Sequence, residues 1–168
     1  MSARPARVGL MIPSSNTMME VDFARDLPPG TALHTARMFL EDTTPAGENR
    51  MLDEFALPAA RDLGTARPDV VVFGCTSAGA LRGNDYDTEL CGRISELTGA
   101  PTVSTIGAVR AAIEVSGAAS IGLVFASCTN FGATAARPVI AERLGLPVVT
   151  SNQAVLAAAV ARLPALAR

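Results

Sequence analysis

Apolar runs alternate along the chain with segments in which apolar residues recur at helical spacing. The clearest strand is Asp69–Phe73, because three consecutive valines are typical of a parallel sheet that is covered on both faces. Other strands are predicted at Arg7–Ile12, Leu33–Met38, Pro101–Ser104, Ile121–Phe125 and Pro147–Thr150. Helices are predicted at Thr17–Arg25, Glu48–Leu63, Thr88–Leu97, 106–113, Pro138–Leu144 and Asn152–Leu163. This alternation predicts an α/β fold with a largely parallel sheet.

Proline and glycine refine the predicted helix limits. Pro58 is expected to bend or break the second helix, since it has no N–H to donate. Pro138 is expected in the first turn of its helix, where a missing N–H costs nothing. Gly99 and Gly145 are expected to end the helices that precede them.

An internal repeat is the most informative pattern. One block contains GCTS at residues 74–77, a helix, and GAPTVS at 99–104; the later block contains SCTN at 127–130, a helix, and GLPVVT at 145–150. The repeat predicts two pseudo-symmetric lobes, residues 1–105 and 106–168, with parallel sheets flanked by helices. The second lobe is shorter than the first, and its last helix is expected to pack back on the first lobe. The alternative is coincidence, since Gly-x-Pro often precedes a strand in α/β proteins.

Cys75 and Cys128 each follow a predicted strand and precede a predicted helix. Ligands of open α/β sheets bind at the carboxyl ends of strands, so these thiols are candidates for catalysis. The positive end of a helix dipole is expected to lower their pKa and favour thiolate. Two opposed thiols allow one to attack a carbon or remove a proton while the other delivers a proton. The alternative is that they are core residues, which is the interpretation favoured for Cys91.

Polar residues surround these cysteines in sequence. Neutral hydrogen-bonding side chains at strand ends predict a site for a small mono- or dicarboxylate, with candidate ligands Ser14, Asn16, Thr76, Ser77, Thr129 and Asn130. The same residues could instead be ordinary helix N-caps.

Composition excludes several function classes. All 14 basic residues are Arg, which excludes a Schiff-base lysine, a pyridoxal phosphate aldimine and a P-loop lysine. The net charge of −2 gives no field that attracts nucleic acid. His34 is the only histidine and no C-x-x-C occurs, so neither a catalytic triad nor a metal site is expected.

The chain also gives an expectation of location. The apolar run Val8–Ile12 is too short for a signal peptide core or a membrane span, so no membrane association is expected. The three widely spaced cysteines are expected to be reduced thiols, and a cytoplasmic location follows by default.

The motifs resemble those of the aspartate/glutamate racemase superfamily, in its maleate cis–trans isomerase and arylmalonate decarboxylase branch. The resemblance rests on VGLMIPSSNT at residues 8–17, FGCTS at 73–77, SCTNF at 127–131 and PVVTSNQA at 147–154. It departs from the family where residues 121–124 run almost directly into Cys128, since family members carry several dozen residues there, including a substrate-contacting tyrosine. The resemblance therefore implies an internal deletion in the second lobe, and exposed apolar surface left there would favour a homo-oligomer.

The resemblance also implies an activity. Cys75 would be the nucleophile and Cys128 the proton donor and acceptor of a cofactor-independent isomerase that converts maleate to fumarate. Asn16 would hold a substrate carboxylate, with help from Ser14, Thr76 and Thr129. The alternatives are an Asp/Glu-type racemase, an arylmalonate decarboxylase, or an inactive family member that only binds small acids.

Overall fold

Two parallel sheets make up the described strands of this computed structural model, which describes residues 4–115, 124–126, 128–130 and 133–164. The strands are β1 (Ala6–Pro13), β2 (Thr31–Met38), β3 (Val70–Phe73), β4 (Thr102–Ser104), β5 (Val124–Ala126) and β6 (Val148–Thr150). The helices are α1 (Met19–Asp26), α2 (Pro45–Arg50), α3 (Ala56–Gly64), α4 (Thr76–Leu81), α5 (Gly83–Thr98), α6 (Thr105–Val115), α7 (Ala133–Leu144) and α8 (Ser151–Val160), with a π-helical turn η1 (Met51–Phe55) between α2 and α3. The predicted α/β class is confirmed.

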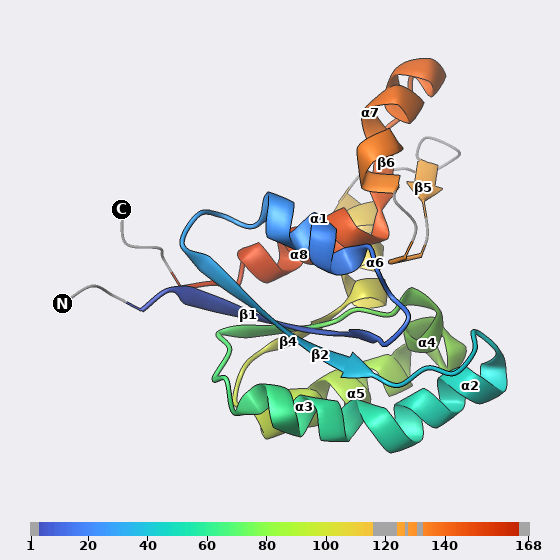
Figure 1. Ribbon diagram of the computed structural model, residues 1–168. Helices are drawn as coiled ribbons and strands as arrows, with labels where there is room; N and C mark the ends of the chain where they lie inside the picture. The colour runs from blue at the N-terminus through green and yellow to red at the C-terminus, as the bar shows by residue number, and fades with distance from the viewer. Residues whose placement is uncertain (1–3, 116–123, 127, 131–132, 165–168) are drawn as a thin grey trace.

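The larger sheet has the strand order β2-β1-β3-β4, and all its pairs are parallel. Both of its faces are covered. Along β1 the side chains of Val8, Leu10 and Ile12 pack with α1 and α8, whereas Met11 packs on the opposite face with η1, α3 and α5. Figure 1 shows α1 and α8 on one side of the sheet and α3 and α5 on the other. The alternation follows from the two-residue period of a strand.

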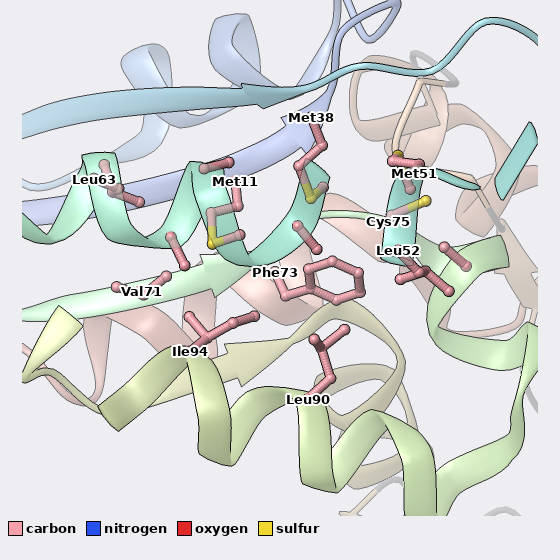
Figure 2. Packing of buried hydrophobic residues seen from close by; sticks show 14 of the residues in the cluster. Met11, Met38, Met51, Leu52, Leu63, Val71, Phe73, Cys75, Leu90 and Ile94 are labelled. Atoms are coloured by element: carbon pink, nitrogen blue, oxygen red, sulfur yellow. The ribbon is translucent and has the colours of Figure 1, made fainter. Parts of the chain in front are cut away.

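The core on the α3–α5 side reaches the carboxyl end of β3. Figure 2 shows Phe73 between Leu90 of α5 and the methionines of β1, β2 and η1, with Cys75 at the margin of this cluster. Phe73, Met11 and Met51 have no exposed surface. Cys75 is therefore positioned by a well-packed apolar layer.

The smaller sheet lies apart from the larger one. Strands β5 and β6 pair in parallel, with Val124 opposite Val148, and α7 extends beyond them at one end of the molecule (Figure 1). After β6 the chain returns to the larger sheet as α8, which packs against α1, α6, β3 and β4. The lobe boundary after Thr105 stays a prediction. Of the predicted strand Ile121–Phe125, residues 121–123 lie outside the described residues.

The structure corrects part of the Pro58 prediction, the expected break, and the whole of the Pro138 prediction. Helical backbone continues from Pro45 to Gly64, so Pro58 does not break it. The wider η1 turn, in which the Ala56 N–H reaches the carbonyl of Met51, ends shortly before the proline, which lies in the first turn of α3. Helix α7 begins at Ala133, so Pro138 lies inside it and not in its first turn. In the part of the chain described, no helix is both long and apolar enough to span a membrane.

Candidate active site

A cavity of about 350 Å³ opens at the carboxyl ends of β1 and β3. Its volume suits a small organic ligand. Both Cys75 and Cys128 line it, although 52 residues of sequence lie between them. The other lining residues are Pro13, Ser15, Asn16, Leu40, Thr43, Glu48, Thr76, Ser77, Ala80, Ile106, Thr129 and Asn130.

Cys75 directly precedes α4 and follows β3 through Gly74. Its side chain is buried, and its Sγ lies 3.7 Å from the Ser77 hydroxyl. Gly74 permits this route because a Cβ there would lie 2.6 Å from the sulfur of Met19 and 2.9 Å from the Met11 carbonyl. A larger residue at position 74 would clash with the backbone of β1, which cannot move as the Met19 side chain can.

Cys128 sits in an exposed turn with a φ of 87°, a conformation that non-glycine residues rarely adopt. The two residues after it are fixed by the loop between β1 and α1. Asn16 Nδ2 donates to Thr129 Oγ1 at 2.9 Å, and the Thr17 amide donates to Asn130 Oδ1 at 2.9 Å. These bonds hold the Cys128 turn against the cavity.

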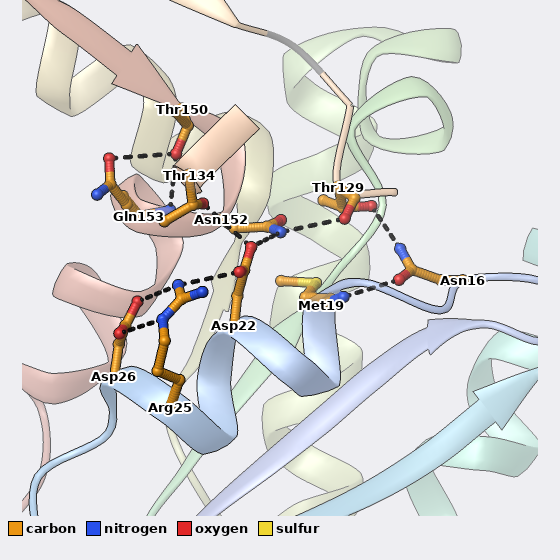
Figure 3. Close-up of polar contacts among 10 residues, drawn as sticks. All are labelled: Asn16, Met19, Asp22, Arg25, Asp26, Thr129, Thr134, Thr150, Asn152 and Gln153. Atoms are coloured by element: carbon orange, nitrogen blue, oxygen red, sulfur yellow. Dashed lines mark hydrogen bonds and ion pairs between the residues drawn. The ribbon is translucent and has the colours of Figure 1, made fainter. Parts of the chain in front are cut away.

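A second polar cluster, formed by Asp22 of α1, Thr134 of α7 and Asn152 of α8, also holds the Cys128 turn (Figure 3). Asn152 Nδ2 donates to Asp22 Oδ2 at 2.7 Å and to the Thr129 carbonyl at 3.1 Å. Thr134 Oγ1 also donates to Asp22 Oδ2, at 3.0 Å. The buried carboxylate of Asp22 thereby connects α1 with α7, α8 and the Cys128 turn.

Known proteins share both the fold and part of the sequence. The maleate isomerase of Geobacillus stearothermophilus is 31% identical over 135 residues, which cover 73% of this chain and 53% of that protein. The maleate isomerase Iso from Pseudomonas putida S16 is 26% identical with a TM-score of 0.62, covering 86% of this chain and 62% of that one. The chain belongs to the aspartate/glutamate racemase superfamily, in its maleate isomerase and arylmalonate decarboxylase branch. No protein-family model matches the sequence.

Two further structures share the fold of this superfamily member. Arylmalonate decarboxylase is 19% identical with a TM-score of 0.78 over 96% of this chain and 94% of that one. A cysteine-to-serine variant of Nocardia farcinica maleate cis–trans isomerase, which carries a covalently bound succinylcysteine intermediate, is 14% identical with a TM-score of 0.78 over 91% of this chain and 90% of that one. The chain spans about half the length of the curated maleate isomerase that it matches.

The protonation of Cys75 differs from the sequence expectation. Burial raises the pKa of the Cys75 thiol, and the charges of Glu48 and Cys128 act in the same direction. Hydrogen bonds from the Ala78 amide and the Ser77 hydroxyl lower the pKa but do not offset burial. The expectation that a helix dipole lowers the pKa of Cys75 is therefore wrong. Helix α4 has only six residues, and desolvation by burial is the largest influence on the pKa of Cys75.

The predicted carboxylate ligands occupy two kinds of position. Asn16, Thr76, Ser77, Thr129 and Asn130 line the cavity. Ser14 instead supports the loop behind it, where its hydroxyl accepts from the Leu40 amide at 3.0 Å.

Asn16 also has a structural role within the lining. Its Oδ1 accepts from the amides of Met18 and Met19 at 3.1 and 3.0 Å, so it holds the start of α1. The N-cap position of α1 is Met18, so Asn16 is not the N-cap itself but supports the entry to α1 from within the cavity wall.

Glu48 is a site residue that the sequence reasoning missed. It is 5% exposed, lines the cavity from α2, and its Oε1 accepts a hydrogen bond from the Ser77 hydroxyl. A signal existed in the sequence, because Glu48 shares a helical face with Met51, Leu52 and Phe55. A carboxylate on an apolar helix face is the exception that marks a buried polar site.

Cys91, the third cysteine, is not part of the candidate site. Cys91 lies on α5 away from the cavity, and burial together with the charge of Asp87 raises its pKa to about 12. Across the described residues, no cluster of three or more His, Cys, Asp or Glu side chains could hold a metal ion.

Proposed function

We propose that this protein is a cofactor-independent cis–trans isomerase that acts on maleate or a close cis analogue, with Cys75 as nucleophile and Cys128 as proton donor and acceptor. The observation that carries the proposal is that two free thiols from the two halves of an internal repeat line one cavity. The sequence relationship to a maleate isomerase supports the same chemistry.

The reaction needs no atom from outside the cavity. The Cys75 thiolate adds to one carbon of the double bond and forms a C–S bond, while the π-electron pair takes the proton of the Cys128 thiol at the other carbon. The resulting succinyl thioether has a single bond about which it rotates. The Cys128 thiolate then removes that proton, the C–S bond breaks, and Cys75 leaves as thiolate with the trans product.

The neutral side chains of the cavity wall support this chemistry by orienting the substrate. Asn130 offers a side-chain amide that can donate to a carboxylate, whereas the hydroxyls of Thr76 and Thr129 already donate to Ser151 Oγ and to the Gly74 carbonyl. The pKa of Cys75 is raised by burial, so the reactive thiolate becomes more abundant as pH rises. Turnover is therefore expected to increase with pH through the normal range of thiol ionisation.

The test is to incubate the purified chain with maleate and follow fumarate by absorbance. Cys75→Ser and Cys128→Ser are each expected to lower kcat/KM by roughly 100-fold or more, because each removes a group that acts at the reacting carbons. Cys91→Ser is the matched control, since Cys91 lies outside the cavity. Absence of turnover in the parent chain at high protein concentration and alkaline pH would refute the proposal.

One observation favours a second candidate, a protein that binds small acids without converting them. A thiol with a raised pKa is less nucleophilic at neutral pH than an activated catalytic cysteine. This candidate predicts that succinate binds in the cavity, that Cys75→Ser leaves its affinity unchanged, and that no fumarate forms. Calorimetry with succinate, run beside the turnover assay, separates the two.

A further inference from the structure

The charge of the cavity wall does not match a substrate with two carboxylates. Glu48 is the carboxyl group among the lining residues, and the described wall contains no Arg, Lys or His. Two arginines on neighbouring segments already have acidic partners. Arg37 donates to Glu20, and Arg82 donates to Asp53 Oδ1 at 2.7 Å. A dianion that enters this cavity would meet a negative charge without a compensating cation.

Glu48 is placed to act on the ligand itself. It is 5% exposed and lies in the same cavity wall as Ser77 and Cys75. The Ser77 hydroxyl donates to Glu48 Oε1, so its proton is committed, and its oxygen lies 3.7 Å from Cys75 Sγ. Ser77 was predicted from the sequence to donate to a substrate carboxylate, and in this structure it is not free to do so.

The lining residues from the loop after β1 and from the Cys128 turn have a different character. Asn16, Thr129 and Asn130 are neutral, and they come from the loop after β1 and the Cys128 turn. One carboxylate can lie on that side without meeting a like charge. These neutral lining residues can therefore accommodate an anion, whereas the carboxylate of Glu48 favours a hydrogen-bond donor.

We propose that Glu48 selects a substrate whose second polar group is an N–H donor, an amide or an ammonium, in place of a second carboxylate. This inference rests on the proposed function for turnover but not for binding. In the cis-alkene series the preferred substrate is then a half-amide such as maleamate and not maleate. A carboxylate near Glu48 is repelled, whereas an N–H group can donate to the Glu48 carboxylate.

The test measures binding of three unreactive probes to the full chain by calorimetry: succinate, its half-amide succinamate, and 4-aminobutanoate. Succinamate or 4-aminobutanoate is expected to bind roughly tenfold or more tightly than succinate, and the tighter of the two identifies the donor as amide or ammonium. Glu48→Gln is expected to bring the three affinities close together, mainly by strengthening succinate binding. Gln keeps an acceptor for Ser77 and has nearly the same shape, so the fold is retained.

Glu54→Gln is the matched control, because it removes a carboxylate from η1 at an exposed position where Glu54 pairs with Arg50. It should leave the affinity ratios of the parent chain unchanged. Succinate binding as tightly as both donors in the parent chain overturns the proposal, and so does failure of all three probes to bind. If the probe preference holds but neither maleate nor maleamate is isomerised, the proposed function fails and this inference stands. If maleate is converted faster than maleamate, the proposed function stands and this inference fails.

Discussion

The two sheets of the molecule are held in place by different kinds of contact. The sheet of β2, β1, β3 and β4 has an apolar layer on each face, and its central residues have no exposed surface. The turn that carries Cys128 and the start of α8 are instead joined to the larger sheet by hydrogen bonds among polar side chains such as Asp22, Asn152 and Asn16. One half of the site is thus fixed by packing and the other by a polar network, so the two halves should respond to different mutations.

The largest expected effect comes from opening a cavity in the packed half. Leu10 lies in the middle of β1 with no exposed surface, so Leu10→Ala is expected to cost about 2–5 kcal/mol of unfolding free energy. The matched change in the other region is Val139→Ala on α7, where the side chain is 50% exposed, and it should cost about 0.5 kcal/mol or less. Urea unfolding of both variants measures the difference. Equal losses would show that the two regions do not differ in packing.

The next effect concerns the polar network. Asp22→Ala removes the acceptor of Asn152, Thr134 and Arg25, and it is expected to cost about 2–3 kcal/mol because buried donors lose their partner. The loss should be local: amide hydrogen exchange is expected to accelerate at 128–130 and 148–153 while β1 and β3 stay protected.

Asp26→Ala is the control for that experiment. Its carboxylate pairs with Arg25 at the surface, where ion pairs contribute little to stability. Amide exchange at 128–130 and 148–153, and in β1 and β3, should therefore stay as in the parent chain. Uniform acceleration in Asp22→Ala, reaching β1 and β3, would mean that the polar network supports the whole fold and not the Cys128 turn alone.

The same contrast explains how far the sequence predicted the molecule. Local patterns were sufficient where packing dominates: the valines of β3 and the continuous apolar run of β1 identify buried parallel strands directly. The repeat also brought Cys75 and Cys128 to one cavity. These features depend on residues close together in sequence, or on a motif that occurs twice.

The remaining features depend on partners far apart in the chain. Asn16 Nδ2 donates to Thr129 Oγ1 across 113 residues of sequence, and no local pattern indicates that a residue just before a helix will also hold a distant turn. The pKa of Cys75 could not be predicted for a similar reason, because burial is set by the whole fold and is the largest influence on that pKa. The wrong start of α7 arose from treating Pro138 as a helix signal, although the helix begins at Ala133.

The smallest effect that still separates the two halves is a shift in thiol reactivity. Burial raises the pKa of Cys75, and the negative charge of Glu48 raises it further. Glu48→Gln removes that charge and keeps the burial, so the pKa of Cys75 is expected to fall part of the way toward the ordinary thiol value of about 8.5. Alkylation by iodoacetamide, followed at each cysteine by peptide mass mapping across pH, measures this shift.

Cys91 serves as the internal reference in that experiment, because its pKa of about 12 is raised by burial and by Asp87 and has no contribution from Glu48. The alkylation midpoint of Cys75 should move to lower pH in Glu48→Gln while that of Cys91 stays in place. A Cys75 midpoint that moves upward would mean that the loss of Glu48 disturbs the Ser77 and Ala78 hydrogen bonds to the sulfur more than it relieves the charge. In that case Glu48 would act on Cys75 by holding α4 in position, and the packed half of the site would extend through α2 to the start of that helix.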